Sequence, residues 1–304
     1  MKKDLLAIGD LGTEDILDIL DQAADIKKNG PKYADALKTK SIGLIFQKPS
    51  NRTRVSFEIG MFQMGGHSIY LGSSEIGMGG RESVKDVACV LSRYLSGIVA
   101  RTYKHEVVEE LAKYASIPII NGLSDLAHPC QALGDMFTIK ERFKSFKGLT
   151  LAYIGDGNNV LNSLMVAAAK LGIGMKVATP VDYAPDRSMV KLAKSLALKS
   201  GSKLEISSDP KAAAKDADIL YTDVWVSMGQ EKEAAKRIKA FSDYQLNDSL
   251  IKKAKTMCVV MHCLPAHRGQ EITDSVMDSN HSIVYDQAEN RMHVQKAILL
   301  KLLK

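Results

Sequence analysis

Short runs of aliphatic and β-branched residues alternate with longer segments of helical period along this chain. In 52–64, for example, the apolar residues Val55, Ile59 and Phe62 recur at positions i, i+4 and i+7, which is one face of a helix. The alternation of the two patterns predicts an α/β fold with parallel sheets. The predicted strands are 42–46, 98–101, 118–121, 151–155, 176–179, 219–223, 258–262 and 283–285, and the predicted helices are 52–64, 82–95, 105–114, 158–171 and 187–200.

Length and composition narrow the class of protein. A chain of 304 residues suits two domains of ordinary size, and the Lys-rich segment 140–148 before a new strand is a candidate junction. The net charge of +6 at pH 7 is mild and favours anionic substrates. We expect no nucleic acid, because no basic arm or aromatic and basic stripe appears. We expect no signal peptide and no membrane span, because the apolar runs are too short.

The four cysteines indicate in which cellular compartment the protein resides, rather than a set of disulfide bonds. Cys89, Cys130, Cys258 and Cys263 contain no C-x-x-C pair, and Cys258 and Cys263 are placed by their odd spacing on opposite faces of one predicted strand. A disulfide framework is therefore not expected. We expect a reducing, cytoplasmic location.

Unusual residues follow the predicted strands, where ligands bind in open α/β sheets. After strand 42–46 the chain reads Q-K-P-S-N-R-T-R and opens a helix, for which Ser50 is a good N-cap. The free amides and positive dipole end of such a helix favour an anion, and Arg52 and Thr53 add charge and a hydroxyl. The alternative is a plain capped helix with solvated arginines.

Two further strands end in candidate binding residues. Arg101 closes strand 98–101, although a single arginine there is ordinarily a surface residue. The motif H-P-C-Q at 128–131 follows strand 118–121, and proline fixes the turn that presents His128 and Gln131. A lone histidine is more often structural, so a functional role for His128 is supported only by the other motifs around it.

The turn G-D-G-N-N-V at 155–160 resembles the dinucleotide-binding G-x-G-x-x-G motif. Val160 replaces the third glycine, and Asp182 is too distant to be a convincing ribose-binding acid. Two amides suit a small polar ligand better than a pyrophosphate. An NAD-dependent oxidoreductase is thus a weak alternative.

The last two strands are followed by the most polar segments. Asp223 ends strand 219–223 and precedes S-M-G at 227–229, and strand 258–262 runs into H-C-L-P-A-H-R-G at 262–269. His262, Cys263 and His267 are potential zinc ligands. A fourth ligand is missing for a structural site, and neighbouring residues of a strand point to opposite faces. We therefore expect no metal and no cofactor.

Taken together, these motifs resemble those of the carbamoyltransferase family, in the family's order from Leu11 to Gln295. The segment 50–54 resembles its S-T-R-T-R motif and 128–131 its H-P-x-Q motif, which aspartate-using members share. Asp223 with 156–159, 227–229 and 262–265 is typical of ornithine-using members. Aspartate enzymes would carry H-P-L-P-R in place of 262–266, and putrescine enzymes would lack S-M-G. The segment A-E-N-R at 288–291 is similar to the family's closing motif.

The resemblance implies an enzyme that transfers the carbamoyl group of carbamoyl phosphate to the side-chain amine of L-ornithine. One alternative is a carbamoyltransferase that uses another amine, such as putrescine. The others are the NAD-dependent oxidoreductase and a non-catalytic relative that binds carbamoyl phosphate or zinc. The implied carbamoyl-phosphate residues are Ser50, Asn51, Arg52, Thr53, Arg101, His128, Pro129, Cys130, Gln131, Cys263, Leu264 and Arg291, of which Arg101, His128 and Cys263 would be catalytic. The implied ornithine residues are Asn159, Asp223, Ser227 and Met228.

The resemblance also implies an architecture and an assembly. Residues 1–140, with a C-terminal helix at 288–304 returning to them, would form a carbamoyl-phosphate domain, and 148–287 an ornithine domain, each with a parallel sheet flanked by helices. The protein would be a homotrimer or a multiple of one.

Two positions depart from the family pattern. Asn51 stands where threonine is usual, and Gly77 stands where many relatives place a glutamine that reaches a neighbouring subunit's site. We expect the glycine-rich segment 77–82 to keep that role, with Arg81 in place of the glutamine. The alternative is that Arg81 is a solvated loop residue.

Overall fold

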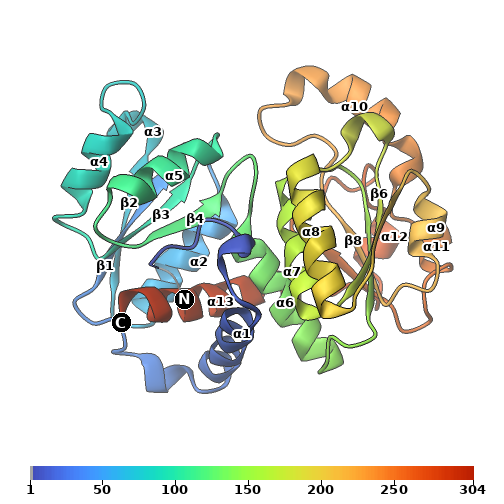
Figure 1. Ribbon diagram of the computed structural model, residues 1–304, viewed down its shortest axis with the longest axis horizontal. Coiled ribbons are helices and arrows are strands. Elements are labelled where there is room, and N and C mark those ends of the chain that lie inside the picture. Colours follow the sequence, from blue (N-terminus) through green and yellow to red (C-terminus); the bar gives the residue numbers. More distant parts are fainter. Residues whose placement is uncertain (1–2) are drawn as a thin grey trace. The chain divides into compact units, whose positions relative to one another are not determined.

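The computed structural model describes residues 3–304, so Met1 and Lys2, with which the first predicted domain begins, lie outside the described residues. The chain divides into two compact units (Figure 1). The first runs to Phe137 and includes Glu289–Lys304, and the second is Thr138–Ala288. The division falls inside helices α6 (Pro129–Phe143) and α13 (Val284–Leu303).

The first unit contains a parallel sheet with the strand order β2-β1-β3-β4. Its strands are β1 (Ser41–Phe46), β2 (His67–Gly72), β3 (Gly97–Arg101) and β4 (Ile119–Leu123). β1 reads S-I-G-L-I-F and is buried from Ile42 onward, as is expected of a central strand covered on both faces. The edge strand β2 alternates between exposed and half-buried positions instead.

Helices cover both faces of this sheet. Those of the first unit are α1 (Thr13–Lys28), α2 (Asn51–Phe62), α3 (Ser73–Ile76), α4 (Val84–Leu91) and α5 (His105–Tyr114), with short 3-10 turns at Ile8–Asp10 and Gly30–Tyr33. α4 and α5 share a core with Ile45 and Ile98. The C-terminal helix α13 returns to this unit as expected, since Leu303 lies against Gly97 and Lys296 against Gly60.

The second unit contains a parallel sheet with the order β7-β6-β5-β8-β9. Its strands are β5 (Thr150–Ile154), β6 (Gly174–Ala178), β7 (Leu204–Ser207), β8 (Ile219–Thr222) and β9 (Val259–His262). Its helices are α7 (Asn159–Leu171), α8 (Arg187–Ser200), α9 (Pro210–Ala214), α10 (Ala234–Ala240), α11 (Asp248–Ile251) and α12 (Asp274–Met277), with 3-10 turns at Val181–Tyr183, Glu231–Glu233 and Ser242–Tyr244.

α7 and α8 lie side by side on one face of the second sheet, and α9, α11 and α12 lie on the other (Figure 1). The core on the latter face includes the aromatic residues Trp225, Phe241 and Tyr244. The predicted α/β fold with two parallel sheets is thus confirmed, and the carboxyl ends of β1, β3, β5, β8 and β9 carry the residues that the sequence singled out.

Three strand assignments differ from the sequence prediction. The predicted strand 283–285 is wrong, because α13 begins at Val284 and only a single bridge joins Ser282 to Val260. β2 and β7 were not predicted. Both are edge strands with several exposed positions, so neither shows the continuous apolar run of a central strand. Cys258 and Cys263 flank β9 rather than lying within it.

Helix α2 is formed as predicted and is capped by Ser50, as predicted. Its apolar stripe, however, does not enter the core of the unit: Val55 is 48% exposed and Phe62 is 77% exposed. The buried side of α2 carries Phe57 and Met61 instead. Within residues 3–304, no helix is both long enough and apolar enough to cross a membrane.

Candidate active site in two halves

The start of α2 and the helix α13 meet in the first unit at the residues that the sequence predicts for an anionic ligand. The Ser50 hydroxyl accepts a hydrogen bond from the Thr53 amide at 3.2 Å. The Arg291 guanidinium on α13 donates to Thr53 Oγ1 at 2.9 Å, and both side chains are buried. Because the Thr53 oxygen accepts from Arg291, its own hydrogen can be donated to a ligand oxygen.

His128 lies among three arginines. Its side chain is 5% exposed, and burial followed by the charges of Arg291, Arg101 and Arg52 lowers its pKa well below the usual value. His128 is therefore neutral near pH 7 and presents one N–H donor. Arg101 is 6% exposed at the end of β3. The structure thus brings together the predicted residues Arg52, Thr53, Arg101, His128 and Arg291 in one largely buried, positively charged cluster.

The remaining predicted residues of this unit differ in their accessibility. Gln131 is buried, and its amide donates to Asp135 at 2.8 Å. Cys130 is fully buried, its thiol donates to the Asn121 carbonyl, and burial raises its pKa to about 12. Its side chain is therefore an uncharged packing group. Pro129 is the first residue of α6, and Asn51 is exposed at the first position of α2.

Asp223 is the centre of a group of hydrogen bonds in the second unit. One carboxylate oxygen accepts from the Cys263 thiol at 2.9 Å and from the Val224 amide at 2.8 Å. The other accepts from the Asn158 amide at 2.7 Å. The structure therefore connects Asp223, predicted to bind ornithine, with Cys263, predicted to be catalytic, through a hydrogen bond. Asn158 of the D-G-N-N turn belongs to the same hydrogen-bonded group, although the sequence assigned it no separate role.

The turn after β5 cannot bind a pyrophosphate, because its backbone amides are already hydrogen-bonded within the protein. The Asn158 side chain caps α7 by accepting from the Val160 and Leu161 amides, so it fills the place that an anion would take. The Gly157 amide is bonded to the Tyr183 carbonyl, and a Cβ at Gly157 would lie 2.4 Å from the Ala184 backbone. These contacts leave the dinucleotide alternative without a phosphate site on this turn.

His262 supports the neighbouring turn rather than offering a metal ligand. Nε2 of its ring lies 3.1 Å from Glu271 Oε1, and Nδ1 accepts from the Leu264 amide at 2.8 Å. Asp223, His262 and Cys263 could in principle surround an ion, since their ligand atoms lie within 4.8 Å of one another. Both ring nitrogens of His262 are already engaged, however. His262 instead holds Leu264, whose φ of 57° lies in the left-handed region.

The S-M-G segment forms a turn that is bonded to itself. The Ser227 amide donates to the Gln230 side chain at 3.0 Å, and the Gly229 amide donates to the Glu231 carboxylate at 2.9 Å. Met228 is 46% exposed. Asn159, the fourth predicted ornithine residue, begins α7 and is half-buried.

A buried ion pair beside these turns has no counterpart in the sequence analysis. Arg237 on α10 contacts Asp156 at 2.6 Å, and the Arg237 Nε donates to the Trp225 carbonyl at 2.6 Å. Burial raises the pKa of Asp156 to about 6, against the opposing charge of Arg237. Arg237 stands in a short helix among lysines, so nothing local in the sequence distinguishes it from a solvated side chain.

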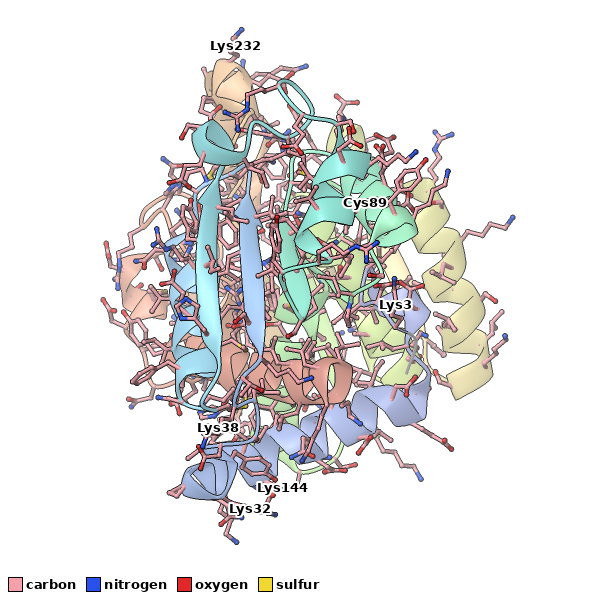
Figure 2. All side chains as sticks on the ribbon, turned by 90° about the vertical axis from the view of Figure 1, so that its left-hand side faces the viewer. Lys3, Lys32, Lys38, Cys89, Lys144 and Lys232 are labelled. Atoms are coloured by element: carbon pink, nitrogen blue, oxygen red, sulfur yellow. The ribbon has the colours of Figure 1, made fainter. Side chains whose placement is uncertain are left out.

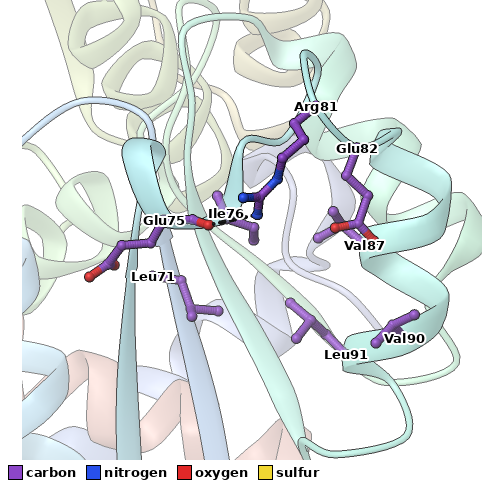
Figure 3. A pocket seen from close by; sticks show the side chains of 8 residues that line it. All are labelled: Leu71, Glu75, Ile76, Arg81, Glu82, Val87, Val90 and Leu91. Carbon is purple, nitrogen blue, oxygen red and sulfur yellow. Dashed lines mark hydrogen bonds between the residues drawn. The ribbon is translucent and has the colours of Figure 1, made fainter.

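The glycine-rich segment after β2 folds onto its own unit (Figure 3). The Arg81 guanidinium donates to the Glu75 carbonyl at 3.0 Å, at the edge of a cavity of about 240 Å³. Gly77 and Gly79 have φ angles of 58° and 80°, so both use conformations that favour glycine. The other residues that line the cavity are Leu71, Ile76, Glu82, Val87, Val90 and Leu91.

Comparisons with known proteins agree with this arrangement. Residues 3–141 match the carbamoyl-P binding domain, and residues 147–302 the Asp/Orn binding domain, of aspartate/ornithine carbamoyltransferases. The chain therefore belongs to the aspartate/ornithine carbamoyltransferase family. Among similar proteins, an ornithine carbamoyltransferase from Archaeoglobus fulgidus is 52% identical over 99% of this chain and 97% of its own length.

Solved structures give the same picture. The chain is similar to the ornithine carbamoyltransferase from Pyrococcus furiosus, with a TM-score of 0.95 at 52% identity over 97% of this chain and 95% of that one. It is also similar to that from Thermus thermophilus, with a TM-score of 0.90 at 44% identity over the full length of both chains. At these identities the similarity covers the amino-acid sequence as well as the fold.

Proposed function

We propose that this chain is an enzyme that transfers the carbamoyl group of carbamoyl phosphate to the side-chain amine of L-ornithine, giving L-citrulline and phosphate. The observation that carries the proposal is the Asp223 carboxylate, bonded to Cys263 and Asn158, in a chain of the carbamoyltransferase family. Carbamoyl phosphate is an anion and ornithine carries a net positive charge, so their binding sites require opposite charges. The first unit supplies buried arginines and the second supplies buried carboxylates.

Carbamoyl phosphate binds to the first unit. Its phosphate lies at the N-terminus of α2, where Arg52, the Thr53 hydroxyl and the helix dipole stabilise negative charge. Arg291 orients the Thr53 hydroxyl, so that it donates to the phosphate rather than accepting. Ser50, Asn51, Pro129, Cys130 and Gln131 complete this half-site through the main chain or by supporting it.

Arg101 and His128 act on the carbamoyl group. Negative charge grows on the carbonyl oxygen as the amine attacks, and donors already in place for that charge lower the barrier by roughly 2.7–4 kcal/mol each. A neutral His128 donates one hydrogen bond to this oxygen, beside those of Arg101. Both act as electrophilic donors, so no covalent intermediate is required.

Ornithine binds to the second unit, with its amino-acid end on Asn159, Asp223, Ser227 and Met228. Asp223 attracts the α-ammonium group, while Asn158 holds the Asp223 carboxylate in one orientation. Putrescine keeps the ammonium group that Asp223 attracts but lacks the α-carboxylate, so it would forgo the contacts of the carboxylate with the rest of this half-site. Cys263 and Leu264 line the position of the reacting amine.

The reacting amine must lose a proton, because an alkylammonium group has a pKa of about 10.4. In the structure the Cys263 thiol donates to Asp223, so Cys263 carries a proton of its own. It can accept another only after passing this proton to Asp223. The leaving phosphate is the alternative acceptor.

We further propose that the protein is a homotrimer, or a multiple of one, in a reducing compartment such as the cytoplasm. The exposed stripe of Val55, Ile59 and Phe62 on α2, next to the edge strand β2, supports self-association. All four cysteines are free, which supports the compartment. Light scattering of Phe62→Ser protein tests the assembly, since loss of this contact should release smaller species.

The central test is an assay of carbamoyl transfer from carbamoyl phosphate with ornithine, putrescine and aspartate as rival acceptors. Ornithine should be used at least about tenfold better than either rival, because only ornithine can satisfy Asp223 and the S-M-G turn together. Equal rates with ornithine and putrescine would remove the assignment.

A further inference from the structure

We propose that Arg237 is a positioning residue for the acceptor half-site, because its guanidinium joins the two turns that present Asp223 and the groups around it. The inference rests on the proposed function and extends it to a residue that touches neither substrate. The Arg237 side chain is 5% exposed.

The guanidinium makes three different kinds of contact. It pairs with Asp156, at the end of β5, at 2.6 Å, and its Nε donates to the Trp225 carbonyl, after β8. Its plane lies 4.6 Å from the centre of the Tyr183 ring and 5.6 Å from that of Phe241. Arg237 therefore connects α10 to the segments that follow β5, β6 and β8.

The two turns that Arg237 joins are those that carry the acceptor residues. Asp156 stands two residues before Asn158, which donates to Asp223. Trp225 stands midway between Asp223 and Ser227. A displacement of either turn would change the position of the Asp223 carboxylate relative to the S-M-G turn, and both are proposed to bind ornithine.

The position of the S-M-G turn depends on this connection. Among the described residues, the Ser227 and Gly229 amides bond only within 227–231, so the turn is not tied to the sheet through them. Beyond it, Lys232 projects outward from the surface (Figure 2). The Trp225 carbonyl bond thus holds the chain at the base of the turn.

The geometry requires an arginine and not merely a positive charge. A lysine could pair with Asp156, but its compact ammonium cannot also donate to the Trp225 carbonyl and stack on Tyr183 with the same plane. Removing Arg237 alone leaves the buried Asp156 without its charged partner, so a loss of stability is expected beside any effect on the acceptor half-site. The two effects are separated by measuring binding of each substrate under conditions in which the variant is folded.

The experiment compares Arg237→Met with Arg237→Lys and Asp156→Asn in the full-length protein. A matched control is Lys255→Met, which removes an ion pair to Asp218 at the opposite ends of β5 and β8. Steady-state kinetics give KM for each substrate, and thermal unfolding shows that each variant is folded. Trp225 is the only tryptophan of the chain, so its fluorescence reports directly on the base of the turn.

Arg237→Met should raise KM for ornithine about tenfold or more and leave KM for carbamoyl phosphate within about twofold. Arg237→Lys and Asp156→Asn should show the same selectivity with smaller factors. Quenching of Trp225 by acrylamide should increase in Arg237→Met, and titration with norvaline, an ornithine analogue without the side-chain amine, should give a correspondingly weaker Kd. Lys255→Met should behave as the wild type in all these measurements.

A folded Arg237→Met protein with the wild-type KM for ornithine and the wild-type norvaline affinity would overturn the inference, as would an equal rise in KM for both substrates. If Arg237→Met does not fold, Arg237→Lys and Asp156→Asn decide by the same two criteria. Wild-type protein that does not carbamoylate ornithine would instead overturn the proposed function, and the norvaline titration would still test the inference.

Discussion

The Cys263 thiol donates a hydrogen bond to the Asp223 carboxylate across 2.9 Å, so the thiol holds its proton between the two side chains. This direction of donation makes Asp223 the first proton acceptor of the pair. If the pair removes the proton of ornithine, its importance must depend on how much of the amine is already neutral.

Cys263→Ala should therefore lower kcat/KM for ornithine strongly near pH 7, by roughly 10²-fold, the low end for proton-transfer catalysis. The loss should be much smaller near pH 10, where about a third of the amine is neutral. The measurement is a pH–rate profile of both proteins. An equal loss at every pH would leave Cys263 as a group that only positions Asp223.

His128 should make the stability of the protein depend on pH in a definite direction. Burial and three arginines lower its pKa, so the folded state keeps His128 neutral, whereas the unfolded chain takes up a proton near pH 6.5. Because the unfolded state binds more protons below that pH, stability is lost as the pH falls from about 6.5 toward the folded pKa.

Urea unfolding of the wild type and of His128→Asn checks this point. The wild type should lose stability between about pH 7 and pH 5.5 more steeply than His128→Asn, by up to about 1.4 kcal/mol per pH unit. His67→Asn, at an exposed histidine, serves as the control and should keep the wild-type slope. Identical slopes for all three proteins would mean that His128 is charged in the folded state.

Gly134 should be required for the position of Arg291. A Cβ on Gly134 would lie 3.0 Å from Arg291 Cγ, so alanine would force the Arg291 side chain to shift by a few tenths of an ångström. We expect Gly134→Ala to raise KM for carbamoyl phosphate severalfold, because Arg291 orients the Thr53 hydroxyl. KM for ornithine should change little.

Gly60→Ala is the matched control for that prediction. Gly60 is also a helical glycine facing α13, but a Cβ there would meet Lys296 at an ordinary 3.4 Å. This variant should retain full activity and gain about 0.4–1 kcal/mol of stability, as helical glycine replacements do where space permits. If both variants behave alike, the contact with Arg291 has no part in substrate binding.

Arg81 should serve a neighbouring subunit if the family's shared site is kept here. In that case Arg81→Ala raises KM for carbamoyl phosphate, since an arginine donates to phosphate oxygens, and leaves KM for ornithine nearly unchanged. The structure shows Arg81 donating to Glu75 of its own chain, a weak exposed contact that an incoming anion could replace.

Mixed oligomers provide the decisive measurement for Arg81. Subunits with Arg81→Ala, mixed with inactive Arg101→Ala subunits, should recover some activity, because one interface then joins an intact Arg101 to an intact Arg81. Hybrids that form and remain inactive would show that Arg81 acts, at most, within its own chain.

Sequence patterns were sufficient for the buried strands but not for the two exposed edge strands, β2 and β7. β1, β3, β5 and β8 read as continuous apolar runs because both of their faces are buried. β2 and β7 are half-exposed edge strands, so they lack that signal. The segment 283–285, where α13 begins, matches the pattern of a strand because a short apolar run looks alike in a strand and in a helix.

The candidate site was predictable to the extent that its residues follow strands in short motifs. Ser50 was recognisable as a cap from its position alone, and Asp223 and Cys263 from the segments that surround them. Arg237 was not, because its partners Asp156 and Trp225 are distant in sequence and only the fold brings them together.

The caps of helices α2 and α7 occupy different numbers of backbone amides. Ser50 uses a single amide at the start of α2, whereas Asn158 uses two at the start of α7. An oxyanion that competes for the α7 terminus must displace a side chain that also holds Asp223, and it must approach that carboxylate. Under the proposed function, the same kind of helix end would attract phosphate in one unit and disfavour it in the other, so that inorganic phosphate, the product of each turnover, would not compete with the incoming amino acid.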